Sequence, residues 1–166
     1  LLLVDKPEGL SSHDVVNRVR RLSGVRRVGH AGTLDPLATG LLLVSIGRVT
    51  RLNEYLVGHD KKYLATVRLG QATNTYDAEG EVTEERPFST ITPSAIANAL
   101  PAFRGTIQQR PPIYSAIKKD GQPLYKLARK GIEVDIPTRE ITIHALDVLD
   151  YSPPFLQLDI HCSSGT

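Results

Sequence analysis

The chain has 166 residues, of which 40% are hydrophobic and 23% are charged, and its formal net charge is +2. A chain of this length forms about one domain with a buried core, and the composition is ordinary for a soluble globular protein. No apolar run approaches the roughly eighteen residues of a membrane helix, so we expect no membrane partner. The single cysteine, Cys162, excludes an internal disulfide and fits a buried strand position in a cytoplasmic protein. No Cys or His cluster has the spacing of a zinc site, so we expect no metal.

Charged residues are distributed unevenly along the chain. Residues 15–34 contain no acid and five arginines: Arg18, Arg20, Arg21, Arg26 and Arg27. Residues 111–131 contain one acid and five basic residues: Lys118, Lys119, Lys126, Arg129 and Lys130. Residues 77–86, in contrast, contain five acids and one arginine. This segregation predicts a polyanion-binding face, although either basic stretch alone also fits a solvated helix face.

The first predicted helix has signals at both of its ends. Ser11 and Asp14 have the spacing of a capping box, with Asp in place of the usual Glu or Gln. Gly24 lies just past the expected end of the helix. Between these signals, apolar residues recur at helical spacing: Val15, Val16, Val19 and Leu22.

The rest of the chain predicts further strands and helices, so the fold class is α+β. Strands are expected at residues 1–4, 41–46, 61–69, 132–136, 141–150 and 155–162. Helices are expected at residues 49–56, 92–100 and 124–130, and a loop at 25–40. In the last strand, alternation places four residues on one face: Leu156, Leu158, Ile160 and Cys162.

The clearest chemical pattern is the loop at residues 29–40, with the sequence GHAGTLDPLATG. Its three glycines permit tight turns and close approach by another molecule, and Pro36 favours an extended Asp35. A carboxylate on a restrained loop suits a nucleophile, although an isolated Asp-Pro pair is more often an ordinary turn. The glycine spacing matches neither of the common phosphate-binding loops.

This loop closely resembles the signature of the TruB family of pseudouridine synthases. Other segments resemble further motifs of that family in the same order: residues 5–12, 62–77, 111–131 and 162–166. The resemblance implies one catalytic domain over residues 1–166, with a thumb-like RNA-binding insertion at 111–137. It also implies the pseudouridine synthase fold, which is a mixed, largely antiparallel sheet with flanking helices and a central RNA-binding cleft.

The family's activity implies that the protein isomerises uridine 55 in the T-arm of tRNA after flipping the base, without a cofactor. The resemblance makes Asp35 the nucleophile and Tyr63 the active-site tyrosine, which we expect to face each other across the cleft. Whether Asp35 attacks the sugar or the base stays open. The expected substrate-binding residues are His30, Gly32, Thr33, Leu34, Lys6 and Asp77. The expected RNA-binding residues are Arg26, Arg27, Lys118, Lys119, Arg129 and Lys130.

Two of these residues have a second interpretation. Lys6 fits a structural support better than a base, and Asp77 fits an Asx turn with Gly80 as well as a contact in the site. In the family the last motif continues into an arginine that pairs with the catalytic aspartate, and a PUA domain follows. We therefore expect this chain to be a fragment with impaired catalysis.

Two other functions stay open. An RNA-binding or tRNA-folding module would use the basic surface without needing Asp35, and a guide-RNA-dependent synthase would work inside a complex. We expect tRNA as the partner and no obligate protein partner.

Overall fold

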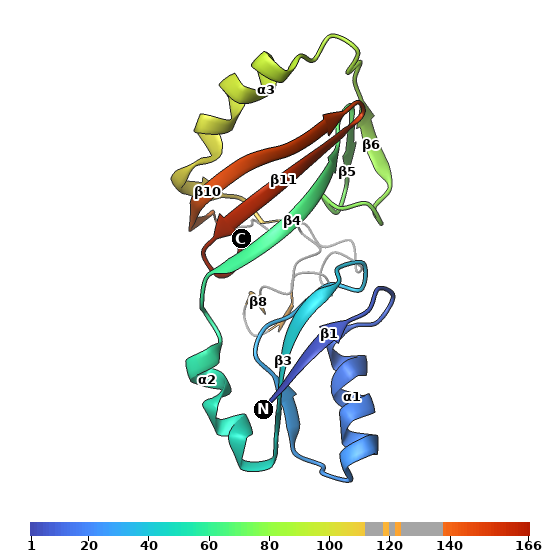
Figure 1. Cartoon of the computed structure of the whole chain (residues 1–166), viewed down its shortest axis with the longest axis vertical. Coiled ribbons are helices and arrows are strands. Elements are labelled where there is room, and N and C mark those ends of the chain that lie inside the picture. The colour runs from blue at the N-terminus through green and yellow to red at the C-terminus, as the bar shows by residue number, and fades with distance from the viewer. Residues whose placement is uncertain (112–117, 120–121, 124–137) are drawn as a thin grey trace. The chain divides into compact units, whose positions relative to one another are not determined.

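The computed structural model describes residues 1–111, 118–119, 122–123 and 138–166 (Figure 1). These residues form two compact units, Leu1–His59 and Asp60–Thr166, and each has its own hydrophobic core. The helix expected at 124–130 and the strand expected at 132–136 lie outside the described residues. In the thumb-like segment, two short strands pair in antiparallel fashion: β8 (Lys118–Lys119) and β9 (Gln122–Pro123).

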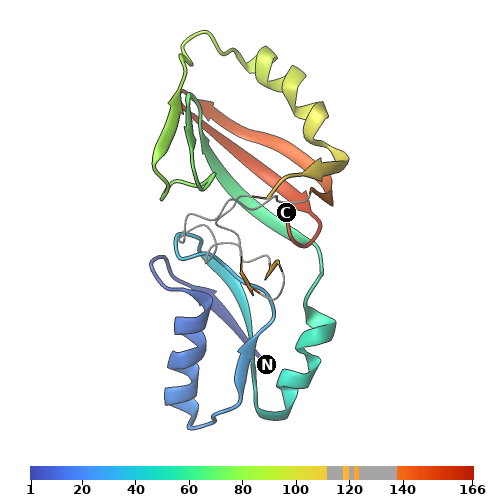
Figure 2. The same cartoon turned by 180° about the vertical axis from the view of Figure 1, so that it is seen from behind.

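The first unit is a three-stranded antiparallel sheet with a helix packed along it (Figure 2). In spatial order its strands are β1 (Leu2–Lys6), β3 (Gly40–Ile46) and β2 (Val28–His30). The helix is α1 (Ser12–Ser23), and the core lies between this helix and the sheet. Its buried residues are Val15, Val16, Val28, Leu42 and Val44.

The capping signals of α1 are confirmed. The Ser11 side chain accepts a hydrogen bond from the Asp14 backbone N–H, and the Asp14 carboxylate accepts one from the Ser11 N–H. Hydrogen bonds from the Ser11 hydroxyl and then the Ser11 backbone lower the pKa of Asp14 below its ordinary value of 3.8. Gly24 ends the helix with a φ of 68°, a left-handed conformation that glycine adopts without steric cost.

Three expectations for the first unit need correction or refinement. Leu22 is 83% exposed instead of buried, because the core contacts the face of α1 that carries Val15 and Val16. The segment expected to be a loop contains the short strand β2, which pairs with β3. The helix expected at 49–56 consists of a 3-10 turn, η1 (Gly47–Leu52), followed by α2 (Asn53–Leu56).

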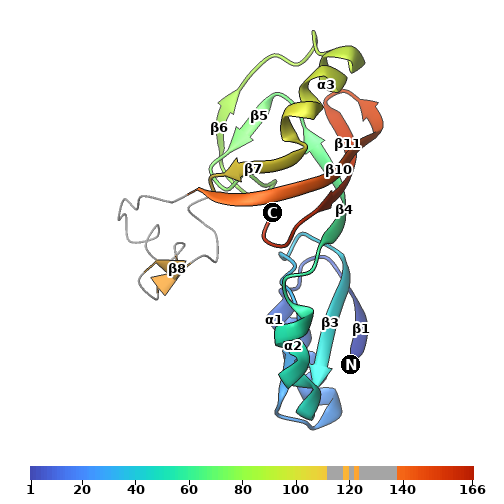
Figure 3. The same cartoon turned by 90° about the vertical axis from the view of Figure 1, so that its left-hand side faces the viewer.

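The second unit is a four-stranded antiparallel sheet covered on one face by a helix (Figure 3). Its spatial order is β4 (Lys61–Arg68), β11 (Phe155–Cys162), β10 (Arg139–Ser152) and β7 (Gly105–Gln109). The helix is α3 (Pro93–Ala99), whose Ile96 packs into the core. A separate hairpin joins β5 (Gln71–Thr73) to β6 (Val82–Glu85).

The ends of α3 follow the sequence signals. The Thr92 hydroxyl accepts a hydrogen bond from the Ala95 N–H and so caps the helix, as Thr-Pro predicts. The α-helix ends before Pro101, which lies in the 3-10 turn η2 (Leu100–Phe103). The buried face of β11 also follows the predicted alternation, since Leu156, Leu158 and Cys162 are buried. The α+β class is therefore confirmed, and all strand pairs in the described residues are antiparallel.

Candidate functional site

The loop that carries Asp35 connects β2 to β3 and turns sharply at the aspartate. The Asp35 carbonyl accepts a hydrogen bond from the Ala38 N–H at 3.0 Å, which closes a four-residue turn. Pro36 occupies the second position of this turn, where its fixed φ is favourable. Gly32 and Gly40 frame the loop with φ values of 120° and 113°, which disfavour any side chain.

Leu34, on one side of Asp35, is held by a buried serine. Ser12 is 2% exposed, and its hydroxyl donates to the Leu34 carbonyl at 3.0 Å while accepting from the Leu34 N–H at 2.9 Å. The Leu34 side chain also packs against the core of the first unit. Leu34 therefore anchors the loop in this structure, and its expected contact with substrate stays a prediction.

Pro36, on the other side of Asp35, is held by a buried lysine and a backbone N–H. The Lys6 side chain is fully buried, and its ammonium donates to three carbonyls: Pro7 at 2.9 Å, Leu10 at 2.7 Å and Pro36 at 3.2 Å. The Gly9 N–H donates to the same Pro36 carbonyl at 2.8 Å. Because an ammonium has three donors, these acceptors satisfy the buried charge. The contacts fit the support role expected of Lys6.

Asp35 itself is exposed between these two anchored neighbours. No hydrogen bond or ion pair engages its carboxylate within the described part of the chain. The backbone is thus fixed while the carboxylate is left available. This arrangement suits a group that must meet a reacting atom in a set geometry.

The other loop residues have local roles in the structure. The His30 ring nitrogen Nδ1 lies within hydrogen-bonding distance of the Gly32 carbonyl, so the ring is turned toward its own loop. The His30 carbonyl accepts from the Asn53 side chain at 3.2 Å, which connects the loop to α2. Thr33 is exposed beside Asp35. Substrate contacts by these residues stay predictions.

Asp77 lies in the second unit and stabilises its own turn. Its carboxylate accepts hydrogen bonds from the Thr75 hydroxyl at 2.7 Å and from the Glu79 N–H at 3.0 Å. These contacts favour the Asx-turn interpretation, with Glu79 as the partner in place of the expected Gly80.

Tyr63 lies on β4 opposite Ile160 of β11 and is 38% exposed. Asp35 belongs to the first unit and Tyr63 to the second. Their expected meeting across a cleft therefore stays a prediction.

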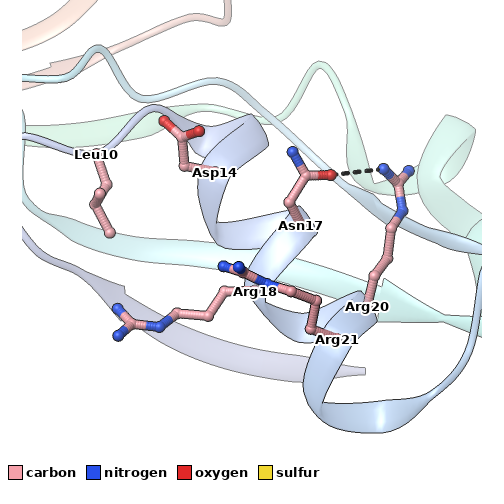
Figure 4. A pocket seen from close by; sticks show the side chains of 6 residues that line it. All are labelled: Leu10, Asp14, Asn17, Arg18, Arg20 and Arg21. Carbon is pink, nitrogen blue, oxygen red and sulfur yellow. Dashed lines mark hydrogen bonds between the residues drawn. The ribbon is translucent and has the colours of Figure 1, made fainter.

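The arginines of α1 do not all have the same role. A shallow surface depression of about 680 Å³ is lined by Leu10, Asp14, Asn17, Arg18, Arg20 and Arg21 (Figure 4). Arg20 bonds to the Asn17 side chain and to the Val28 carbonyl, both at 2.9 Å, so it connects α1 to β2. The charge pattern is compatible with solvated arginines along α1. Arg18 and Arg21 are exposed in this way, whereas Arg20 is half-buried and makes structural contacts.

The expected RNA-binding residues are only partly described. Arg26 and Arg27 are exposed in the segment that follows α1. The side chains of Lys118, Lys119, Arg129 and Lys130 lie outside the described residues. No helix in the described ranges is long and apolar enough to cross a membrane.

Two residues of the motif at residues 5–12, to which no sequence pattern assigned an individual role, complete the anchoring of the loop. Ser12 looked like part of a motif next to the helix cap, but its hydroxyl bridges to Leu34 across 22 positions of sequence. Gly9 contributes a backbone N–H, for which a sequence gives no signal. The motif spacing alone does not show that these residues meet the Asp35 loop.

Comparison with known proteins identifies the relatives of this chain. Residues 20–166 match the model of the TruB family pseudouridylate synthase (N terminal domain). The chain is 49% identical over its full length to tRNA pseudouridine synthase B of Syntrophotalea carbinolica and 48% identical to that of Coxiella burnetii. It spans 54% of the length of each of these relatives.

Solved structures show the same fold. A Cbf5-Nop10-Gar1 complex contains a chain that matches with a TM-score of 0.72 at 24% identity, covering 99% of this chain and 40% of that chain. An H/ACA RNP bound to a substrate RNA containing 2'-deoxyuridine matches with a TM-score of 0.69 at 22% identity, covering 99% and 38%. At these identities the likeness shows the pseudouridine synthase fold alone. With the family model matched over residues 20–166, the chain belongs to the TruB family of pseudouridine synthases.

Proposed function

We propose that this chain is the catalytic part of an enzyme that isomerises uridine 55 in the T-arm of tRNA to pseudouridine, with Asp35 as the nucleophile. The observation that carries the proposal is the exposed Asp35 carboxylate between two backbone positions fixed by buried Ser12 and Lys6. The family and the names of the bacterial relatives support tRNA as the substrate.

The proposed reaction rearranges the substrate without importing any group. The bond between N1 and C1′ breaks, the base turns, and C5 forms a new bond to C1′, while the C5 proton is lost and N1 gains a proton. Asp35 attacks either the base or the sugar and leaves when the new bond is complete. Since nothing is oxidised or transferred to another molecule, we propose that no cofactor takes part.

The target base must leave its stack before it can reach Asp35, which costs a few kcal/mol. Tyr63 supplies a ring that can stack on the flipped base and a hydroxyl that can transfer a proton. Its partial exposure on β4 is compatible with this role. Basic side chains on the tRNA phosphates offset the cost of flipping.

We propose that Arg26, Arg27 and the thumb-like segment provide these phosphate contacts. Neutralising Lys118, Lys119, Arg129 and Lys130 together is expected to weaken tRNA binding. The logarithm of affinity falls with the logarithm of salt concentration, and each lost phosphate contact makes this slope shallower by about one. Titration of labelled tRNA at several salt concentrations measures this slope, and an unchanged slope would make the segment an ordinary solvated surface.

The deciding experiment is an assay of the longest natural form of the protein on an unmodified tRNA transcript, without other proteins or RNAs. Pseudouridine at position 55 supports the proposal, and a product at another position would contradict the assignment of the target. The 166-residue chain is assayed in parallel at saturating tRNA, where we expect a much lower single-turnover rate. Equal rates would show that the 166-residue chain contains every group that the chemistry needs.

The same assay separates the alternatives. An RNA-binding or tRNA-folding module would bind the transcript without forming pseudouridine. A guide-RNA-dependent synthase is suggested by the H/ACA complex among the similar structures, and it would be inactive until a guide RNA is added. The bacterial relatives are about twice as similar in sequence as these complexes, which favours the partner-free enzyme.

A further inference from the structure

The second unit brings two imidazoles and a carboxylate together at residues far apart in sequence. We propose that Asp60, His144 and His161 form an open binding site for a divalent metal ion of the zinc type. One ligand atom from each residue lies within 4.8 Å of those from the other two. The proposal is independent of the isomerase activity, and it differs from the sequence expectation of no metal.

The two histidines lie on the same face of the sheet, next to a β-bulge in β10. Ile143 of β10 lies opposite Cys162, while Ala145 lies opposite His161, so His144 is an extra residue on β10. Ile143 and Leu146 are both buried although they are three positions apart, which regular alternation does not allow. His144 and Ala145 thus both lie opposite His161, and His144 is on the exposed face beside that histidine.

Asp60 reaches the same face from the other neighbour of β11. Lys62 of β4 lies opposite His161, and side chains two positions apart on a strand point to the same side. Asp60 directly precedes β4, so continued alternation carries its carboxylate toward His161. Three separate segments thus converge on one patch of the sheet.

The distances are short enough for one metal ion to draw the three ligands together. Asp60 Oδ2 lies 3.0 Å from His144 Nε2 and 3.8 Å from His161 Nε2. The two imidazole rings have centroids 4.8 Å apart and are tilted by 47°. Zinc bonds of about 2.0–2.1 Å in a tetrahedron separate neighbouring ligand atoms by roughly 3.3 Å. The two separations that involve Asp60 lie on either side of that value, and all three lie within 4.8 Å, so the imidazoles move closer to each other when they share one ion.

The surroundings indicate a site that exchanges its ion with solvent. The side chains of His144, His161 and Asp60 remain 37%, 36% and 50% exposed. Three protein ligands leave at least one tetrahedral position for water, as in zinc sites that are not purely structural. Imidazole and carboxylate donors suit zinc and its neighbours in the first transition row. Lys62 shares this face, so its charge lowers the affinity for a cation.

The test is calorimetric titration of the 166-residue chain with zinc chloride in a buffer that does not chelate zinc. We expect one ion per chain, and we expect His144→Gln and His161→Gln each to weaken binding by at least about tenfold. Asp60→Asn keeps an acceptor for His144 but removes the charge, and it is expected to weaken binding as well. His13→Gln, at an exposed position of α1, is the matched control and should bind zinc like the parent.

A second measurement keeps the proposal falsifiable if a variant folds poorly. X-ray absorption of the zinc-loaded chain should show two imidazole ligands with zinc–nitrogen distances of about 2.0–2.1 Å. Circular dichroism establishes that each variant is folded before its titration is interpreted. No binding of zinc to the folded parent, or equal binding to a folded His144→Gln/His161→Gln variant, would overturn the proposal. The three residues would then be an ordinary ion pair with a neighbouring histidine.

Discussion

Asp35 and Asp77 are both exposed aspartates in loops that resemble motifs of one family, yet the structure uses them differently. The backbone around Asp35 is held by Lys6, Gly9 and Ser12, which come from an earlier part of the chain. The carboxylate of Asp77 instead holds its own turn through Thr75 and Glu79. A carboxylate can serve chemistry when other residues fix its loop, whereas one that fixes its own loop is already engaged.

The two loops also differ in what they require from the fold. The Asp35 loop depends on a fully buried ammonium, which is tolerated because three carbonyls accept its hydrogen bonds. Among the residues that the structure describes, the hydrogen bonds of the Asp77 turn lie within residues 73–81. Substitutions at positions distant in the sequence should therefore disturb the Asp35 loop strongly and the Asp77 turn little.

The largest expected effect is on catalysis. In the longest natural form of the protein, Asp35→Asn should lower the single-turnover rate of pseudouridine formation by at least about a thousandfold, because the proposed nucleophile is lost. Asp77→Asn should lower it by less than about tenfold, because it weakens one turn. Binding of tRNA should stay nearly unchanged in both variants, since phosphate contacts dominate affinity. Equal rate losses in the two variants would remove the distinction between the loops.

Loss of the buried ammonium is the next largest effect. Lys6→Met should lower the free energy of unfolding by about 2–4 kcal/mol, because three carbonyls lose their donor in a buried place. Chemical denaturation followed by circular dichroism measures the change. Lys62→Met, at an exposed lysine of β4, is the control and should change stability by less than about 0.5 kcal/mol. A similar small change in Lys6→Met would show that the ammonium does not hold the loop.

Removing the hydroxyl that holds Leu34 should have a smaller effect. Ser12→Ala is expected to cost about 1–2 kcal/mol of stability, since both polar groups of the Leu34 backbone lose one partner. Thr33→Ala, an exposed change on the same loop, should be close to neutral for stability. Denaturant midpoints of the two variants provide the comparison, and equal midpoints would contradict the anchoring role of Ser12.

The smallest effect concerns the cap of α1, which carries Ser12 into place. The folded pKa of Asp14 lies below its ordinary value of 3.8, so its contribution to stability is present above that value and is lost as the pH falls through the lowered pKa. Asp14→Asn should therefore be less stable than the parent at neutral pH, and the difference should shrink under acid conditions. Thermal unfolding between pH 7 and about pH 3 tests this, and a difference that is constant with pH would contradict it.

Local signals in the sequence predicted local structure well. The capping box at Ser11 and Asp14 and the glycine at Gly24 delimit α1, because caps depend on neighbours within four positions. The alternation in β11 predicted its buried face for a similar reason. The exposure of Leu22 was not predictable, because helical spacing does not say how wide a face the sheet will cover.

Short motifs and their order along the chain were enough to predict the α+β class and the family, and they are also the basis for proposing Asp35. The contacts by which Lys6, Gly9 and Ser12 anchor the residues on either side of Asp35 are visible only in the folded chain. The meeting of Asp60, His144 and His161 on one face likewise depends on the pairing of β4 and β10 with β11, which no pattern in the sequence indicates. The physical reason is that spacing along a chain reports neighbours within a turn or a strand, whereas such clusters depend on which strands pair and in which register.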